Sequence, residues 1–333
     1  MPTSRPILVT GAAGFLGLNV VEALLQRGDG VVAVDRRALP DIALGAVAPH
    51  ARRLHVVQAD VTDAGAMASV IGRLRPRGIV HTAAITSGPA MERAHAALAA
   101  DVNVRGTLNV LEAAASAGVE RVVHFSSGAV YGDNGFGEAP LDEAATVPAP
   151  SVVYAITKLA GERLALRYRA IAGLNLVVAR VGTAFGPWEG DTGVRETLSP
   201  HFQATRLARA GGTALLARPG LRDWIYSRDI AGAALALLDR ASPTPEVANI
   251  GTGQLWSVAQ WCTLLQARHP SFWHGPAATP AAATVNLWAD RDRAPLAVER
   301  LQREVGYRPR FDLEQAFADY ADWLDRTGWM LQR

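Results

Sequence analysis

The segment that most constrains the fold is the stretch 7–17, Ile-Leu-Val-Thr-Gly-Ala-Ala-Gly-Phe-Leu-Gly, an apolar run followed by glycines at intervals of three. It predicts a buried strand, a tight turn and a helix start in immediate succession. Gly11 permits the turn, Gly14 lets the backbone approach a pyrophosphate, and Gly17 allows close helix–strand packing. The helix N-terminus would then present free N–H groups to phosphates. We expect a dinucleotide to contact Gly11, Ala13, Gly14, Phe15, Leu16 and Gly17.

The first 180 residues alternate short β-branched runs with alanine-rich helical patterns. This alternation predicts an α/β fold with a doubly wound parallel sheet of the Rossmann type. The expected strands are residues 7–10, 31–35, 54–58, 78–81, 121–126 and 174–180. The expected helices between them are residues 14–27, 64–73, 94–117 and 151–172.

The last third of the chain has a looser, mainly helical pattern. Helices are expected at residues 199–210, 229–238, 257–268, 294–305 and 313–325. Pro- and Gly-rich connections precede some of them, at 186–187 and 277–283. We therefore expect a dinucleotide-binding domain over 1–180 and a smaller, mainly substrate-binding α/β domain over 181–333, with some of its segments returning to the sheet.

An acidic residue ends the second expected strand, in the run Val-Val-Ala-Val-Asp35. A carboxylate at this point can accept hydrogen bonds from both hydroxyls of an adenosine ribose and would repel a 2′-phosphate, so Asp35 favours NAD over NADP. Arg36 and Arg37 follow directly and could instead pair with such a phosphate. The alternative for Asp35 is an ordinary residue of a strand-end turn.

Polar and small residues end the third and fourth expected strands. Asp60, next to Val61, lies where a side chain can reach an adenine amino group, but an Asp at a strand end can also cap a helix. After His81, the small residues Thr82, Ala83 and Ala84 let the backbone lie against a cofactor. We expect His81 to be a packed, hydrogen-bonded histidine and not a base.

The basic residues are distributed very unevenly between their two types. Of 33 Lys and Arg residues only one is lysine, Lys158, and it follows Tyr154 by four positions. Residues at i and i+4 share a helix face, and an adjacent ammonium lowers the pKa of a phenol by stabilising the phenolate. We therefore expect a tyrosine that exchanges a proton with an alcohol or carbonyl. The alternative is a solvated Tyr–Lys pair without a catalytic role.

The overall composition excludes several other classes of protein. The net charge is +2 and the arginines are scattered, which gives no reason to expect a nucleic-acid or membrane partner. No apolar stretch is long enough for a membrane span, and no signal peptide is expected. The single cysteine, Cys262, cannot form an internal disulfide and is expected to be buried in a cytoplasmic protein. No metal site is expected.

Seven segments in order resemble the extended short-chain dehydrogenase/reductases and, among these, the NAD-dependent epimerase/dehydratase family. They are Thr10–Gly17 (Thr-Gly-Ala-Ala-Gly-Phe-Leu-Gly), Asp60-Val61, His81-Thr-Ala-Ala84, Asn103-Val-Arg-Gly-Thr107, Phe125-Ser-Ser-Gly-Ala-Val-Tyr-Gly132, Tyr154-x-x-x-Lys158 and Arg222-Asp-Trp-Ile-Tyr-Ser-Arg-Asp229. The resemblance spans about residues 6–326.

The resemblance implies a catalytic triad of Ser127, Tyr154 and Lys158. The Ser127 hydroxyl would bind the substrate oxygen, with Ser126 as the neighbouring alternative, while Tyr154 handles the proton. Lys158 would hold the nicotinamide ribose and lower the pKa of Tyr154. The resemblance also implies that Asn103 and Val181 contact the cofactor and that Arg222 meets a sugar-nucleotide diphosphate. Family members often form a homodimer through a four-helix bundle, which implies a dimer face on helices 94–117 and 151–172.

Three departures from the family pattern narrow the expected reaction. Dehydratases place an acid pair directly after the catalytic hydroxyl residue, whereas this chain has Gly128-Ala129, so dehydration is not expected. Thr183 replaces a common asparagine ahead of Gly186-Pro187, which weakens the case for a nucleotide diphosphate. Thr86-Ser87 replaces a basic residue and suits hydroxyl or carboxylate recognition.

The segment 188–200 lies where the family binds substrate, and it contains Arg195. This arginine could bind a carboxylate or phosphate through two hydrogen bonds. The alternative is a surface arginine paired with Glu196 or Asp191.

These observations predict NAD-dependent oxidation of a secondary hydroxyl on a sugar-type substrate, by hydride transfer with Tyr154 as base. The favoured outcome is an epimerase of a sugar or nucleotide sugar, in which the keto sugar turns and is reduced on its other face. The alternative is a dehydrogenase of a non-nucleotide sugar, sugar acid or polyol. A remote third possibility is a non-catalytic dinucleotide sensor, which would not need Ser127, Tyr154 and Lys158 together.

Overall fold

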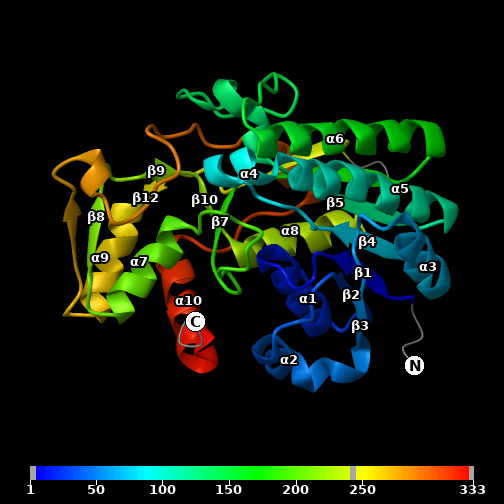
Figure 1. The fold of residues 1–333 in the computed structure, drawn as a ribbon, viewed down its shortest axis with the longest axis horizontal. Coiled ribbons are helices and arrows are strands. Elements are labelled where there is room, and N and C mark those ends of the chain that lie inside the picture. The colour runs from blue at the N-terminus through cyan, green and yellow to red at the C-terminus, as the bar shows by residue number, and fades with distance from the viewer. Residues whose placement is uncertain (1–4, 241–244, 330–333) are drawn as a thin grey trace.

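The chain is described from a computed structural model that covers residues 5–240 and 245–329. Within these residues seven strands form one parallel sheet in the order β11-β6-β5-β4-β1-β2-β3 (Figure 1). Their bounds are β1 (Ile7–Thr10), β2 (Val31–Asp35), β3 (Leu54–Gln58), β4 (Gly78–His81), β5 (Arg121–Ser127), β6 (Leu176–Val181) and β11 (Val247–Ile250). The six predicted strands are confirmed, with small shifts at the ends of β5 and β6. The predicted doubly wound α/β fold is confirmed.

Helices cover both faces of this sheet because its central strands are apolar on both sides. In β1, Ile7 and Val9 belong to one hydrophobic core and Leu8 to the other. The helix pair on one face is α1 (Phe15–Arg27) and α8 (Ser227–Asp239), which pack against each other. The other face is covered by α3 (Ala64–Leu74), α5 (Gly106–Ser116) and α6 (Val153–Ala172).

Strand order reverses beside β1, since β2 lies on one side of it and β4 on the other. The chain therefore leaves β1 and β4 in opposite directions, and a crevice opens at their carboxyl ends. Ligands of doubly wound sheets bind at such a point.

The remaining elements lie mostly on the left of Figure 1, beyond the carboxyl ends of the sheet. Three two-stranded sheets pair β7 (Thr183–Phe185) with β10 (Trp224–Tyr226), β9 (Leu221–Arg222) with β12 (Trp256–Ser257), and β8 (Thr213–Leu216) with β13 (Trp273–Pro276). They pack with α7 (Pro200–Arg209), α9 (Val258–Arg268) and α10 (Leu313–Thr327). Phe185, His201, Trp224 and Trp261 are stacked or edge-on at the centre of this part.

Two helix predictions are wrong in detail. The helix expected at 94–117 begins earlier and is divided into α4 (Pro89–Ala100), a π-helical turn (Asp101–Arg105) and α5. The helix expected at 294–305 is replaced by extended chain, where Leu296 bridges to Leu141, followed by a π-helical turn at Leu301–Val305. Pro295 explains the second error because it disfavours a helical conformation at the residue before it.

Several elements were not predicted. They are α2 (Asp41–Val47), the 3₁₀ segments Ala48–Arg53, Gly128–Gly135 and Pro280–Ala282, the short strands β7, β8, β9, β10, β12 and β13, and the seventh strand of the main sheet, β11. β11 pairs with β6 and so returns the C-terminal part of the chain to the main sheet. Its four residues, Val-Ala-Asn-Ile, are too short a pattern to be separated from the surrounding loop.

Cys262 is fully buried in α9, as predicted, and burial raises the pKa of its thiol to about 12. Among the described residues, no helix is both long and apolar enough to cross a membrane. Nor does that part of the chain contain a group of three or more His, Cys, Asp or Glu side chains that could hold a metal ion.

Candidate functional site

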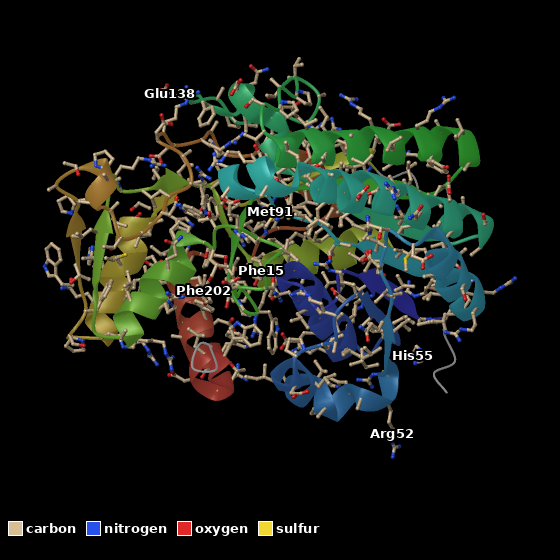
Figure 2. The ribbon with its side chains drawn as sticks, viewed as in Figure 1. Phe15, Arg52, His55, Met91, Glu138 and Phe202 are labelled. Carbon is tan, nitrogen blue, oxygen red and sulfur yellow. The ribbon has the colours of Figure 1, made fainter. Side chains whose placement is uncertain are left out.

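A cavity of about 810 Å³ lies at the carboxyl ends of the central strands and extends toward the C-terminal elements. Figure 2 shows Phe15 and Met91 in the middle of the molecule, whereas Arg52 projects from its edge. All but two of the predicted site residues line this cavity. Those that do are Gly11, Gly14, Phe15, Leu16, Gly17, Asp35, Arg36, Asp60, Val61, Thr82, Ala83, Ala84, Thr86, Ser87, Ser127, Tyr154, Lys158, Val181, Thr183, Arg195 and Arg222.

The glycine turn forms one end of the cavity and has the geometry that a pyrophosphate requires. Gly11 has φ +69°, and a Cβ there would lie 2.7 Å from the backbone of Ala83. A Cβ on Gly17 would lie 2.0 Å from the Gly11 carbonyl oxygen. Helix α1 begins after Gly14 without a side-chain cap. Its first N–H groups are therefore left for a ligand at this end of the cavity.

Asp35 lies at the end of β2 and its carboxylate is held in position by two backbone N–H groups. Ala13 N donates to Oδ2 at 3.0 Å, and Arg37 N donates to Oδ1 at 2.9 Å. Arg37 donates its guanidinium to the Thr192 carbonyl oxygen at 3.0 Å, and its Nε is 3.8 Å from Asp35 Oδ1. These contacts turn Arg37 toward Asp35 and the segment around Thr192, which leaves Arg36 as the adjacent arginine for a 2′-phosphate.

Ala13 and Asn103 are the two predicted cofactor residues that do not line the cavity. Ala13 instead positions Asp35 through the bond just described. Asn103 is buried and uses its amide to hold the backbone after β4, accepting from Ile85 N at 2.8 Å and donating to Ile85 O at 2.9 Å. Its amide also donates to Thr157 Oγ1 at 3.0 Å. The structure thus gives Asn103 a supporting position behind the cavity wall.

Asp60 lines the cavity, and the helix-cap interpretation of this residue is wrong. Its Oδ1 accepts hydrogen bonds from the backbone and side chain of Thr62, at 2.9 and 2.8 Å. Asp63 is the residue that caps α3, by accepting from Ala66 N at 2.9 Å.

The histidine at the end of β4 is a packed residue, as predicted. His81 is buried between the Thr10 hydroxyl, 2.6 Å from Nδ1, and the Thr107 hydroxyl, 3.1 Å from Nε2. Burial lowers the pKa of His81 to about 3. It is therefore neutral at physiological pH.

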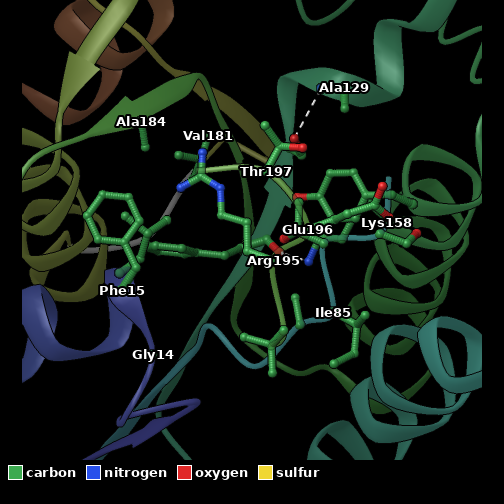
Figure 3. Close-up of a pocket in the computed structure, with 18 of the residues that line it drawn as sticks. Gly14, Phe15, Ile85, Ala129, Lys158, Val181, Ala184, Arg195, Glu196 and Thr197 are labelled. Atoms are coloured by element: carbon green, nitrogen blue, oxygen red, sulfur yellow. Dashed lines mark hydrogen bonds between the residues drawn. The ribbon is translucent and has the colours of Figure 1, made fainter. Parts of the chain in front are cut away.

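Tyr154, in the first turn of α6, meets two hydroxyl groups from separate segments. The side chains of Ser127 and Thr86 lie near its phenol, since both lower the pKa of Tyr154 against the effect of burial. The Ser127 hydroxyl also accepts from Ala129 N at 3.1 Å, the dashed line in Figure 3. Ser126, by contrast, donates its hydroxyl to Glu162 at 3.0 Å. The geometry therefore brings Ser127, and not Ser126, to the phenol.

The expected effect of Lys158 on Tyr154 is wrong for this structure. Burial raises the pKa of Tyr154, and the groups that oppose this are Ser127, Arg195 and Thr86. Lys158 is buried and donates its ammonium to the carbonyl oxygen of Phe125. Desolvation explains the reversal, because it disfavours the phenolate more than the surrounding groups stabilise it. Burial also lowers the pKa of Lys158 to about 8, against the opposing charge of Glu162.

Residues 188–198, which we call the strap, follow β7 and cover the substrate side of the cavity. Arg195 donates to Glu189 Oε1 at 2.8 Å, and the carboxylate of Glu189 is almost fully buried. The predicted alternative, a surface arginine paired with Glu196 or Asp191, is therefore wrong. The guanidinium of Arg195 lies 5.6 Å from the Phe15 ring centroid and 5.3 Å from that of Trp288, and Figure 3 shows it extending toward Phe15.

Arg222 forms the other charged wall of the cavity. It is 6% exposed, and one guanidinium nitrogen is buried without a hydrogen-bond partner among the described residues. Its guanidinium lies over the rings of Trp224 and Trp288, at 5.4 and 5.6 Å. Burial, together with Arg293 and Arg218, lowers the pKa of Arg222 to about 10. A buried cation with an unused donor and positive neighbours is a receptor for an anion.

The sequence reasoning missed two residues of this wall, Trp288 and Arg293. Trp288 is a non-glycine residue at φ +71°, and its indole N–H is buried with no partner in the part of the chain that the structure describes. Arg293 donates to the Gly132 carbonyl oxygen at 3.2 Å. Both precede the helix that was expected at residues 294–305, and no local pattern indicates that this segment passes beside Arg222.

Comparisons with known proteins agree with this geometry. A model of the NAD dependent epimerase/dehydratase family matches residues 7–251. The dTDP-L-rhamnose 4-epimerase of Burkholderia thailandensis is 29% identical, over 96% of this chain and 95% of its own. The UDP-glucose 4-epimerase of Mycolicibacterium smegmatis is 30% identical, over 95% of this chain and 97% of its own.

The fold has solved counterparts. The structure of UDP-glucose 4-epimerase with UDP-glucose from Thermotoga maritima has a TM-score of 0.80 and 26% sequence identity, covering 97% of this chain and 99% of that one. Family match, full-length relatives and shared fold all indicate the same assignment. The chain therefore belongs to the NAD-dependent epimerase/dehydratase family.

Proposed function

We propose that this protein is an NAD-dependent 4-epimerase of a nucleotide sugar. The observation that carries the proposal is a single cavity that joins the glycine turn, the Tyr154–Ser127 pair and an anion receptor at Arg222. The relatives reported above are 4-epimerases by name and match along nearly their whole length, which supports the same reaction here.

NAD fits the described residues. The glycine turn and the N-terminus of α1 would hold the pyrophosphate, Asp35 the adenosine ribose, and Lys158 the nicotinamide ribose. Asp60, Val61, Thr82, Ala83, Ala84 and Val181 line the same part of the cavity and would contact the cofactor. Arg37 is already engaged with Thr192 and Asp35, which supports NAD over NADP.

Tyr154 and Ser127 would act on one hydroxyl of the sugar. Ser127 would donate a hydrogen bond to its oxygen, and Tyr154, as the phenolate, would take up its proton as the alcohol becomes a ketone. A bound NAD would supply the hydride acceptor for the carbon that bears this hydroxyl and the hydride donor for the keto sugar after it has turned. Tyr154 then gives the proton back to the oxygen. The configuration at that carbon is inverted, with no net oxidation and no consumption of cofactor.

The anion receptor supports a substrate with a diphosphate. Arg222 has an unused buried donor, and Arg293 lines the cavity beside it. Burial, and after it repulsion from Arg293 and Arg218, lowers the pKa of Arg222, and the negative charge of a phosphate would offset both effects. Thr183, which replaces the asparagine common in the family, also lines the cavity. Its shorter side chain does not argue against a diphosphate, because Arg222 and Arg293 line the same cavity and can bind one. Thr86 and Ser87 are placed to contact the sugar.

We also propose that two subunits pair through α4, α5 and α6 as a four-helix bundle. Exposed apolar side chains mark this side of the molecule. Val152, at the start of α6, is 48% exposed, and Ile156 in its first turns is 49% exposed. Ile171 at the end of α6 and Leu98 on α4 are 57% and 37% exposed. Apolar side chains of this size on one side favour burial against a second copy. The single buried cysteine agrees with a cytoplasmic location.

The decisive experiment offers purified protein and NAD a panel of nucleoside diphosphate sugars, the matching free sugars and sugar acids. We expect interconversion of one pair of 4-epimers of a nucleotide sugar, detected by chromatography, without growth of reduced-nicotinamide absorbance. Stoichiometric reduction of NAD on a free sugar or sugar acid would instead establish the dehydrogenase. If the protein binds NAD but reacts with none of these substrates, the result would favour the non-catalytic dinucleotide sensor.

The single lysine provides a direct test of the triad. Lys158→Arg keeps the charge, but a planar guanidinium cannot replace a compact ammonium in a buried position. We expect most activity to be lost. Turnover close to that of the wild type would show that the lysine has no special role.

A further inference from the structure

The strap is fastened at its base by contacts that do not involve the sugar-binding side of the cavity. Glu189 accepts hydrogen bonds from Ser199 N at 2.6 Å and from the Ser199 hydroxyl, in addition to Arg195. Its carbonyl oxygen accepts from the indole of Trp329 at 2.6 Å. Trp188 has φ +68° and donates to Glu22 of α1 at 2.9 Å. The two ends of the strap are therefore tied together and to buried elements.

The far edge of the strap is held to the other wall of the cavity by a small set of contacts. Thr86 N donates to Val194 O at 2.8 Å, and Glu196 N donates to Thr86 O at 3.2 Å. The Glu196 carboxylate accepts from Gly88 N at 3.0 Å, Ala90 N at 3.1 Å and Met91 N at 2.7 Å. These three N–H groups belong to the first turn of α4, which has no side-chain cap of its own.

The wall to which the strap is fastened is itself rigid. Ile85, one residue before Thr86, is held through both its backbone groups by the buried Asn103. The edge of the strap can therefore separate from this wall only if the hydrogen bonds between them break. Glu196 accepts the side-chain hydrogen bonds of this set. Its pKa is lowered chiefly by these backbone N–H groups, so it is ionised at neutral pH.

Two residues, Thr86 and Arg195, connect the strap to the catalytic tyrosine, Tyr154. Thr86, which forms a β-bridge with Arg195 of the strap, lines the cavity with Tyr154. Thr86 and Arg195 both lower the pKa of the Tyr154 phenol. Glu196 and Arg195 are adjacent in the chain, and both line the cavity (Figure 3). Release of the edge at Glu196 would thus both open the cavity and displace contacts of Tyr154.

We propose that Glu196 is a positioning residue that keeps the strap closed on the first turn of α4, so that the keto sugar turns inside the cavity instead of leaving it. The proposal rests on the epimerase function proposed above. An epimerase has to retain an oxidised sugar between two half-reactions, whereas a dehydrogenase has to release it. In this protein the closing contact is made by an exposed carboxylate and three backbone N–H groups, a contact that can form and break within each turnover.

The test compares Glu196→Ala and Glu196→Gln with the wild type in two measurements. The first is the fraction of turnovers that end in released keto sugar, trapped chemically and counted against epimer formed. We expect that fraction to rise about tenfold or more in Glu196→Ala, because all three acceptor contacts are lost. We expect a smaller rise in Glu196→Gln, which keeps one carbonyl oxygen.

The second measurement is amide hydrogen exchange, which does not depend on activity. Exchange at residues 86–91 should become faster in Glu196→Ala and remain unchanged in β1 and β5. Asp312→Ala is the matched control, because Asp312 caps α10 in the same manner, accepting from Gln315 N at 2.8 Å, away from the cavity. It should destabilise α10, seen as faster exchange in its first turn, and leave both the released fraction and exchange at 86–91 unchanged.

The outcomes separate this proposal from the one on which it rests. If the wild type forms no epimer on any substrate, the proposed function fails. Suppose that the wild type is an epimerase. If Glu196→Ala then releases no more keto sugar than the wild type, and exchange at 86–91 is unchanged, Glu196 does not hold the strap. Faster exchange without release would also overturn the proposal, since the strap would then open without letting the sugar escape.

Discussion

The two ends of the cavity recognise their ligands by different means. At the cofactor end, recognition depends on backbone: a positive φ at Gly11, the uncapped start of α1, and one carboxylate, Asp35, already held by two N–H groups. At the substrate end, it depends on side chains that come from distant segments and have unused donors, above all Arg222 and Trp288. At the first end the unused donors are backbone N–H groups at the start of α1, and at the second they are buried side-chain groups.

This difference separates stability from function within one cavity. At the cofactor end the buried carboxylate of Asp35 is already held by two backbone N–H groups. A buried arginine with an unused donor is destabilising until an anion reaches it. Substitutions at the substrate end should therefore impair binding without loss of stability, whereas those at the cofactor end should affect both.

The largest expected effect is at the junction of the two ends, where Tyr154 lies. Tyr154→Phe removes the group that exchanges the proton, and we expect kcat to fall about a thousandfold. NAD affinity should be little changed, because the glycine turn and Asp35 are intact. Tyr168→Phe is the control on the same helix, since its exposed hydroxyl donates only to Glu112. An equal loss of kcat in both variants would show that the effect is not chemical.

Lys158 gives a prediction on stability. Its pKa is about 8 in the folded protein and about 10.5 in the unfolded chain, so between these values the unfolded chain binds more protons. The free energy of unfolding should therefore rise with pH from about 8 to 10.5, by roughly 3 kcal/mol in all. Lys158→Met, which has no such group, should lack this rise.

The measurement is chemical denaturation of both proteins across that pH range, without added cofactor. The quantity to compare is the difference in unfolding free energy between wild type and variant, because other groups titrate equally in both. A constant difference would mean that Lys158 stays protonated in the folded protein.

Arg222→Met tests the substrate end directly. We expect KM for the nucleotide sugar to rise about ten- to hundredfold, the loss of one hydrogen-bonded charge contact, with a small effect on kcat. Tm should stay level or rise, because an apolar side chain replaces a desolvated cation. Arg303→Met is a control, since Arg303 is exposed and paired with Glu304. A large fall in Tm in Arg222→Met would contradict the contrast between the two ends.

The smallest effect is expected for Asp35→Asn at the cofactor end. It weakens the acceptors for the ribose hydroxyls and removes the charge that repels a 2′-phosphate. We expect about a tenfold loss in kcat/KM for NAD, a gain for NADP, and a modest fall in Tm because Ala13 N and Arg37 N lose a charged acceptor. Kinetics with both cofactors would measure this. An unchanged preference for NAD over NADP would show that Asp35 only stabilises the turn after β2.

The sequence by itself determined the cofactor end and the sheet. Its signals are local patterns: the glycine spacing, the acid at Asp35, the small residues after β4 and the Tyr154–Lys158 pair. Such patterns can be recognised in the sequence because local backbone geometry depends on neighbouring residues. The alternation of strands and helices likewise predicted six strands of the sheet.

Only the tertiary structure decided the substrate end, the partners of the charged groups and the pKa of Tyr154. Arg195 pairs with Glu189 and not with its nearer candidates, Arg222 meets Trp288 from 66 positions further along the chain, and β11 joins a sheet that begins more than two hundred residues earlier. Such contacts, and the desolvation that raises the pKa of Tyr154, follow from how distant segments pack. The spacing of residues in the sequence does not predict which distant segments pack together.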